Sequence, residues 1–164
     1  HEMTHGFDDQ GRQYDKDGNL KDWWTAEDAK NFEARAAVMV NFFDSIEVAP
    51  GVHANGEFTL GENIADHGGL QVSYQAFKKA TAAAPLKNEN GFTPEQRFFL
   101  SYANVWAGNI RPEEILKLTK IDPHSLGKWR VDGALPQIGA WYEAFNITEK
   151  DPMYLPVDKR VSIW

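Results

Sequence analysis

His1-Glu2-Met3-Thr4-His5 is the stretch of sequence from which both the fold and the chemistry can be argued. Residues four apart on a helix lie on one face, so the two histidines can present imidazole nitrogens to one zinc ion at about 2.0 to 2.1 Å. Glu2 lies beside them, where its carboxylate can take a proton from a water on that ion. The pattern indicates a helical metal site with His1 and His5 as ligands and Glu2 as general base. A surface helix that carries two histidines by chance is the alternative.

A third metal ligand can come from a second helix. One known extension of the motif requires a histidine ten positions after the first, and Gly11 stands there, so that extension is excluded. Glu62-Asn63-Ile64-Ala65-Asp66 instead places two carboxylates four residues apart on one helix face. One carboxylate can reach the metal, and the other can hold a ligating imidazole by its far N–H, which is a common arrangement around zinc. A solvated acidic pair on an acidic chain is the alternative.

The composition indicates one globular domain. The chain has 164 residues, 42% of them hydrophobic and 25% charged, with six Trp, five Tyr and ten Phe to fill a core. Its longest nearly apolar stretch, 34–43, contains Arg35 and Asn41 and is shorter than a bilayer span. The net charge is -7, and Lys and Arg do not gather into a patch. We therefore expect no nucleic-acid partner and no membrane contact from this segment.

Helical periodicity and capping signals dominate the chain, which makes the predicted fold class mainly α. After one or two helical turns within 1–7, the spacing predicts helices over 26–45, 61–83, 94–107, 112–120 and 136–146. Asn55-Gly56, between 52–54 and 57–59, predicts the turn of one short β-hairpin, the only β structure expected. Gly68-Gly69 inside a helix is unfavourable relative to alanine, so another segment should approach the backbone there.

Several other features have no catalytic interpretation. The segment 15–19 has the look of a calcium loop, but its glycine is misplaced and the twelfth position is Ala26, which excludes an EF-hand. Asn146-Ile147-Thr148 is a glycosylation sequon, which matters only in a chain that passes through the endoplasmic reticulum. His53 and His67 are expected to be structural or exposed.

A series of short motifs extends over essentially all 164 residues. It comprises His1 to Asp9 with Gly11-Arg12, Asp22-Trp23-Trp24-Thr25, Asn55-Gly56, Leu60 to Asp66 with Gly68-Gly69-Leu70, Val105-Trp106, Arg111-Pro112, His124 with Arg130, and Trp164. In this series the sequence resembles the C-terminal part of the neprilysin and endothelin-converting-enzyme family of zinc metallopeptidases. The chain departs from animal members in having no cysteine, which favours a bacterial source.

The resemblance implies a role for each matching residue around the metal. His1, His5 and Glu62 would bind one Zn²⁺ per chain, and Glu2 would be the general base. Asp66 would orient His1 or serve in proton transfer.

Further matching residues would act on the peptide substrate. His124 would steady the oxyanion of the tetrahedral intermediate, and Arg130 would hydrogen-bond a substrate backbone carbonyl on the primed side. Val105 and Trp106 would line the pocket for the residue after the scissile bond, which in this family is usually hydrophobic.

At the level of fold, the resemblance implies a gluzincin-like, thermolysin-like catalytic subdomain. Residues 1–164 would be its C-terminal catalytic fragment, since the sequence lacks an initiator Met and the family's upstream lid and substrate-aligning strand. The expected partners are a peptide substrate and the upstream part of the same polypeptide. The expected location is extracytoplasmic, either periplasmic, cell-surface or secreted, with the bacterial cytoplasm as an alternative.

The expected function is that of a zinc-dependent endopeptidase which cleaves oligopeptides. A first alternative is an inactive structural fragment that keeps the fold, with or without zinc, but has no turnover. A second alternative is an interaction module in which H-E-x-x-H is accidental. Stoichiometric zinc would exclude that module.

Overall fold

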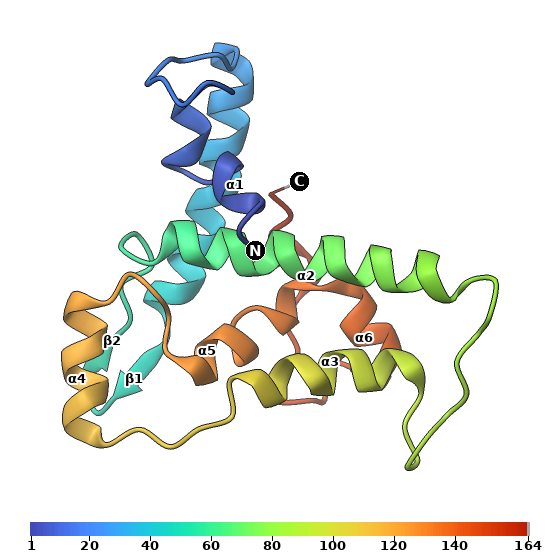
Figure 1. Cartoon of the computed structure of the whole chain (residues 1–164). Helices are drawn as coiled ribbons and strands as arrows, with labels where there is room; N and C mark the ends of the chain where they lie inside the picture. Colours follow the sequence, from blue (N-terminus) through green and yellow to red (C-terminus); the bar gives the residue numbers. More distant parts are fainter. Residues whose placement is uncertain (164) are drawn as a thin grey trace.

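The computed structural model describes residues 1–163, which form a mainly helical chain with one small sheet (Figure 1). The predicted fold class is therefore confirmed. Trp164, the last residue of the motif series, lies outside the described part. Within residues 1–163 the α-helices are α1 (Ala26–Asp44), α2 (Leu60–Thr81), α3 (Pro94–Val105), α4 (Pro112–Ile121), α5 (Gly127–Asp132) and α6 (Gly139–Phe145).

Helices with clear capping signals begin where the sequence predicts. Thr25 and Asp28 form a reciprocal capping box at the start of α1, and Thr93 and Gln96 form another at α3. In each box the threonine hydroxyl accepts a backbone N–H while the third helical residue returns the bond, so two otherwise unpaired donors are satisfied. For all four helices from α1 to α4, the predicted bounds agree with the observed ones to within two residues at either end.

The segment from 127 to 146 differs from the prediction. The short helix α5 has no side-chain cap and spans six residues, so neither capping nor periodicity revealed it. The single helix expected over 136–146 is two elements, a 3₁₀ turn η3 (Leu135–Gln137) and α6. Ile138 separates them, because its backbone is extended at φ −102° and ψ 109°. Asn146 ends α6 in the left-handed region at φ 53°.

The β-hairpin lies a few residues before its predicted position. Strands β1 (Glu47–Ala49) and β2 (Val52–His53) pair antiparallel, and the turn between them contains Gly51 at φ 73°. The prediction of a turn at Asn55-Gly56 is wrong. Gly56 lies instead against the backbone of Val40 in α1, where a β-carbon would clash, and its N–H donates to Asp44 Oδ1 at 2.6 Å. Two isolated bridges, Tyr14 with Leu20 and Glu89 with Phe92, add further β contacts.

Two buried clusters share the central helix α2. Ile64 belongs to the first cluster, with Phe32, Met39 and Phe43 of α1. Leu70, less than two turns further along α2, belongs to the second, with Phe99 of α3 and Trp141 of α6. The apolar positions of α1 thus face the first cluster and those of α3 face the second, as amphipathic spacing requires, while α2 contributes to both. Along α2, Glu62 lies between Leu60 and Ile64 of the first cluster, and Asp66 lies in the part of the helix that links the two clusters.

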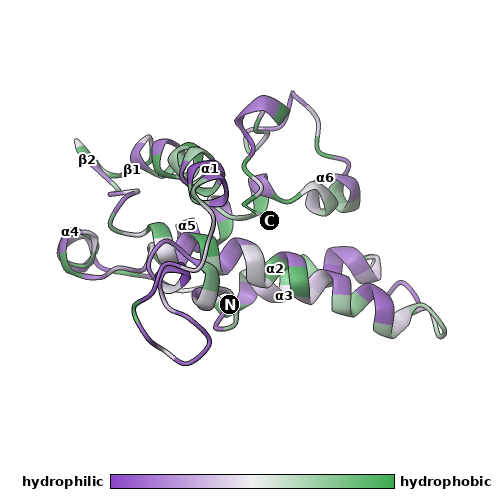
Figure 2. Cartoon of the chain, turned by 90° about the horizontal axis from the view of Figure 1, so that it is seen from above, coloured by the Kyte–Doolittle hydropathy of each residue, from purple (hydrophilic) through white to green (hydrophobic). Residues whose placement is uncertain are grey.

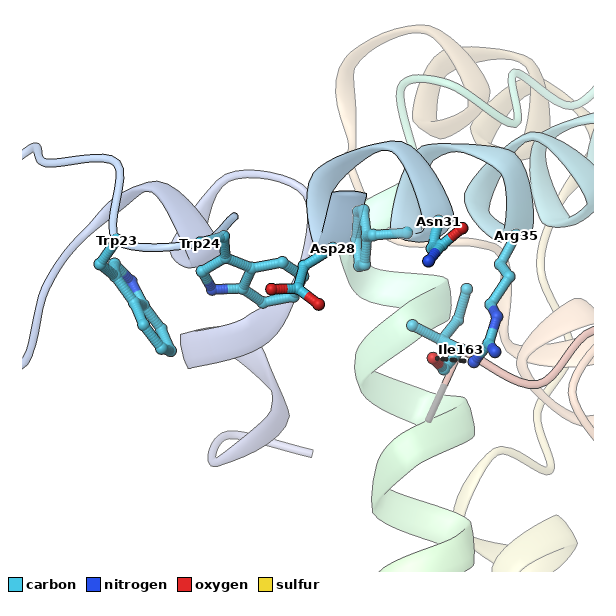
Figure 3. Close-up of a pocket in the computed structure, with 7 residues that line it drawn as sticks. Trp23, Trp24, Asp28, Asn31, Arg35 and Ile163 are labelled. Atoms are coloured by element: carbon cyan, nitrogen blue, oxygen red, sulfur yellow. Dashed lines mark hydrogen bonds between the residues drawn. The ribbon is translucent and has the colours of Figure 1, made fainter. Parts of the chain in front are cut away.

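The last described residues are hydrogen-bonded to α1. Arg35 Nη1 donates to the backbone oxygen of Ile163 at 3.0 Å, and Ile163 is buried in the first cluster. Figure 3 shows Arg35 reaching Ile163 beside a cavity of about 410 Å³ that Trp23, Trp24 and Asp28 also line. This cavity includes none of the predicted site residues, so it is separate from the candidate metal centre.

No described helix is green throughout in the hydropathy colouring of Figure 2. Between residues 1 and 163, no helix has both the length and the apolarity that a membrane crossing requires.

Candidate metal centre

The N-terminal turn brings two imidazoles together. His1 precedes the 3₁₀ turn η1 (Thr4–Phe7), whose second residue is His5, and the N–H groups of Thr4 and His5 donate to the His1 carbonyl. The two rings meet edge to face with centroids 4.8 Å apart, and their Nε2 atoms lie 3.2 Å apart. The predicted helical turns are confirmed, although the turn is 3₁₀ and not α.

The third predicted ligand comes from the first turn of α2. Glu62 Oε2 lies 3.2 Å from His1 Nε2, and Glu62 Oε1 lies 3.5 Å from His5 Nε2. The ligand atoms of these three residues all lie within 4.8 Å of one another. Two imidazoles and one carboxylate, converging from separate elements, form a donor set suited to zinc.

Each imidazole is held by a carboxylate at its other nitrogen. His1 Nδ1 donates to Asp66 Oδ1 at 2.8 Å, and His5 Nδ1 donates to Asp8 Oδ2 at 2.7 Å. These bonds select the tautomer in which each Nε2 carries a lone pair. The two lone pairs therefore face each other and the Glu62 carboxylate, whose Oε2 is buried without a hydrogen-bond partner among the described residues. Such an arrangement is unfavourable without a cation, so the residues fit a metal ion.

Asp8 is a residue that the sequence analysis assigned no role. Its Oδ1 accepts the backbone N–H groups of Gln10 at 3.0 Å and Gly11 at 2.7 Å, while Oδ2 serves His5. The side chain is buried, so the carboxylate has few orientations open to it. The signal was its spacing, three residues after His5, which is the distance at which side chains meet on a helical turn.

Behind His1 lies a buried ion pair. Arg130 of α5 donates to both oxygens of Asp66, from Nε and Nη2, each at 2.7 Å. Burial raises the pKa of Asp66 above its ordinary value, while Arg130 acts in the opposite direction. Burial also opposes the charged form of Arg130, but the bonds and charge of Asp66 outweigh it, so the pKa of Arg130 is raised. Because this pair is bidentate and charged, it fixes the orientation of Asp66 against His1.

His124 also lies close to the carboxylate of Glu62. It follows α4, and its Nε2 lies 3.3 Å from Glu62 Oε2. Asp122 Oδ1 holds it through the ring Nδ1 at 2.7 Å and through the backbone N–H at 3.0 Å. The next residue, Ser125, donates to Asn63 Oδ1 at 2.7 Å, which ties this loop to the helix that carries Glu62. Neither Asp122 nor the bond between Ser125 and Asn63 is predicted from the sequence.

The remaining predicted residues lie around this cluster. Trp106 ends α3, and its ring lies 4.0 Å from the Arg130 guanidinium, a cation–π contact. Val105 is 69% exposed beside it. Arg130 is buried, and its contacts with Asp66 and Trp106 orient it. Glu2 is exposed, and within residues 1–163 its carboxylate makes no hydrogen bond or ion pair.

The helical fold, the motif H-E-x-x-H and the converging glutamate together define a zinc metallopeptidase domain. The profile of peptidase family M13 matches residues 1–161, and the chain belongs to that family.

Known relatives agree with this membership. The chain is 40% identical to human neprilysin over 100% of its own length, and 42% identical to bovine endothelin-converting enzyme 1 over 93% of it. It covers 22% and 21% of those two proteins, so it spans about a fifth of the length of these curated relatives.

Solved structures show the same fold. Zinc metalloprotease Zmp1 of Mycobacterium tuberculosis, in complex with an inhibitor, superposes with a TM-score of 0.94 at 37% identity, over 99% of this chain and 26% of that one. PepO of Lactobacillus rhamnosis superposes with a TM-score of 0.83 at 36% identity, over 99% of this chain and 24% of that one.

Proposed function

We propose that this chain is the catalytic part of a zinc-dependent endopeptidase that cleaves oligopeptides. The observation that carries the proposal is the convergence of His1, His5 and Glu62, with a carboxylate behind each imidazole. These three residues would hold one zinc ion per chain. When bound there, zinc would supply Lewis-acid polarisation of the scissile carbonyl and a lowered pKa for a water molecule.

The chain's own residues would carry the proton and the developing charge. Glu2 would accept the proton of the attacking water, and its exposed carboxylate is free of competing bonds within the described residues. Asp66 would keep the proton on His1 Nδ1, which leaves Nε2 free to ligate.

His124 would donate Nε2–H to the oxyanion. Since Asp122 accepts from its Nδ1, this donation requires both ring nitrogens to carry protons. Losing one such donor typically costs about 2.7 to 4 kcal/mol of transition-state stabilisation.

Arg130 and Trp106 would act on the substrate and on its pocket. Arg130 Nε and Nη2 are bonded to Asp66, so a substrate carbonyl would meet a guanidinium that is already oriented. Trp106 covers one face of that group, while exposed Val105 would contact an apolar substrate side chain.

The substitution Glu2→Gln tests the catalytic proposal in a protein that contains this whole chain. We expect peptide cleavage to fall by at least about a hundredfold, in line with the loss of a general base, while zinc content stays stoichiometric. Met3→Gln, an exposed neighbour on the same turn, is the matched control and should leave both unchanged. Cleavage at the unaltered rate by the Glu2 variant would refute the mechanism.

For the chain by itself, a further part of the proposal is zinc binding with weak or no turnover. Val105 is 69% exposed, and a largely apolar cavity of about 640 Å³ beside Phe7, Tyr14 and Trp23 opens to solvent. These exposed residues do not enclose a peptide substrate by themselves. We propose that the upstream polypeptide supplies the remaining substrate contacts, including a lid and a substrate-aligning strand. An extracytoplasmic location belongs to the same proposal. Robust hydrolysis of a short peptide by purified 1–164 would contradict the proposal of weak or no turnover.

A further inference from the structure

Three glycines of α2 face the segment that carries the two histidines. Gly69 lies opposite His1, Gly68 opposite Thr4, and Gly61 opposite Asp8 and Asp9. As the numbers rise along α2 they fall along the facing segment, so 1–9 runs antiparallel to the helix. Gly61, Gly68 and Gly69 are spaced at i, i+7 and i+8, which places them on one face over about two turns. Glu62 and Asp66 lie on the helix between these glycines.

The approach at the glycines is closer than a side chain would allow. A β-carbon at Gly69 would lie 2.6 Å from His1 N and 3.0 Å from its Cα. One at Gly68 would lie 2.6 Å from Thr4 Cγ2 and 2.7 Å from Oγ1. Apolar atoms in proteins approach to roughly 3.5 to 4.0 Å, so either addition would push the segment outward by about 1 Å. The sequence keeps glycine here although glycine is unfavourable in a helix interior.

Such a shift would separate the two histidines from the carboxylates of α2. His1 and His5 lie on the displaced segment, whereas Glu62 and Asp66 lie on the helix. The three ligand atoms lie within 4.8 Å of one another only while the two segments touch. Zinc requires ligand distances within about 0.2 Å of their ideal values, so an outward shift of that size would open the donor set.

We propose that Gly68 and Gly69 are positioning residues of the metal centre, whose missing side chains set the zinc affinity by letting the histidine segment dock on α2. This inference rests on the proposed zinc function. It adds that the ligands alone do not determine the affinity and that the bare helix surface beneath them is required.

The test measures zinc affinity by competition with a chromophoric chelator, in purified protein that contains the whole chain. We expect Gly68→Ala and Gly69→Ala each to weaken zinc binding by about tenfold or more, the range typical of residues that orient ligands. Gly139→Ala is the matched control, because Gly139 is also helical and a β-carbon added there would have no neighbouring atom within 4 Å. It should bind zinc as the unaltered protein does.

A double variant, in which a smaller side chain at position 4 faces a larger one at position 68, distinguishes loss of docking from a general loss of structure. Thr4→Ala removes Cγ2 and Oγ1 and leaves Cβ, which would lie 3.3 Å from the new methyl at position 68. We expect the pair Thr4→Ala with Gly68→Ala to recover zinc affinity to within about threefold of the unaltered protein. Gly69→Ala should not recover with Thr4→Ala, since it meets the backbone of His1.

Melting of the metal-free forms provides a second readout. Alanine favours the helix while the displaced segment loses contacts with α2, so docking predicts a large loss of zinc affinity beside a small change in metal-free melting. If Gly69→Ala fails to fold, the Thr4 and Gly68 series alone decides. Unchanged zinc affinity in Gly68→Ala, or no recovery in the double variant, would overturn the inference. Absence of zinc from the unaltered protein would be a different result, because it would overturn the proposed function as well.

Discussion

At the scale of single residues, the metal centre depends on the carboxylates behind the imidazoles. Asp66 and Asp8 each occupy Nδ1 of one histidine, so both Nε2 atoms point to Glu62. The ring orientation is thereby fixed before any ion arrives, which lowers the entropic cost of binding.

The Asp8 carboxylate can be tested with a nearly isosteric change. In Asp8→Asn, the amide oxygen can still accept from Gln10 and Gly11, but the NH₂ group then faces His5 Nδ1–H and cannot accept its proton. We expect zinc affinity to fall by about tenfold, measured by chelator competition. Asp9→Asn is the control, since Asp9 contacts neither histidine in the described structure, and equal losses in both variants would contradict a specific role for Asp8.

Removing the guanidinium of Arg130 should be costly even without zinc. Arg130→Met leaves the buried Asp66 carboxylate without its bidentate partner, and we expect the free energy of unfolding of the metal-free protein to fall by about 3 to 5 kcal/mol.

Denaturant titration measures this loss. Lys117→Met removes an exposed ion pair with Glu114 and should cost less than about 1 kcal/mol. Similar losses in the two variants would show that burial of the Arg130 pair has no special weight.

The residues of the candidate metal centre differ in how far the sequence indicated them. The convergence of His1, His5 and Glu62 could be predicted because four-residue spacing and carboxylate chemistry restrict zinc ligands to few patterns. Asp8 and Asp122 were missed because Asp in a polar loop has many uses, and only the folded chain shows which imidazole it faces. Close approach at Gly68-Gly69 was predicted from its helical cost, but the approaching residues could not be named.

At the scale of elements, local signals determined which helices could be predicted. α1 and α3 have complete capping boxes, and their starts agree with the prediction. α5 has none, and its position depends on Arg130 reaching Asp66 and on Gly133 packing against Phe43, contacts that are distant in sequence. The hairpin was misplaced because Asn55-Gly56 fits a turn equally well, whereas packing against α1 gave the glycine another use.

The start of α3 offers a test of such a local signal. Thr93→Ala removes the hydroxyl that accepts the Gln96 N–H, and we expect a loss of about 1 kcal/mol in the free energy of unfolding. Thr119→Ala, which removes only a bond to the Ile115 carbonyl within α4, should change stability by less than about 0.5 kcal/mol. Thermal or denaturant unfolding distinguishes the two, and a neutral Thr93 variant would mean that the cap adds nothing.

At the scale of the whole molecule, stability should depend on pH through a buried histidine. His67 is 1% exposed, among residues of α1, α2, α5 and η3, and burial lowers its pKa to about 4. In the unfolded chain the same group takes up its proton near pH 6.5. Between these two pH values the unfolded state therefore binds more protons than the folded state. The free energy of unfolding is expected to fall by roughly 3 kcal/mol as the pH falls from about 6.5 to 4.

Comparison with a variant isolates this contribution. His67→Gln should flatten the fall in unfolding free energy between pH 6.5 and 4, measured by denaturant titration of the metal-free protein. His53→Gln, at an exposed histidine, should keep the slope of the unaltered protein. An unchanged slope in the His67 variant would show that other groups cause the acid sensitivity.

The central helix α2 also divides the chemistry along the chain. His1, His5 and Glu62 all precede the end of α2 at Thr81, whereas Val105, Trp106, His124 and Arg130 all follow the exposed loop after it. The proposed metal ligands and the proposed substrate-binding residues are thus encoded in consecutive stretches. A protease nick within 82–92 would leave each stretch covalently intact. The two pieces would then be held together by the second cluster, by Ile163 buried in the first cluster and by the ion pair between Asp66 and Arg130.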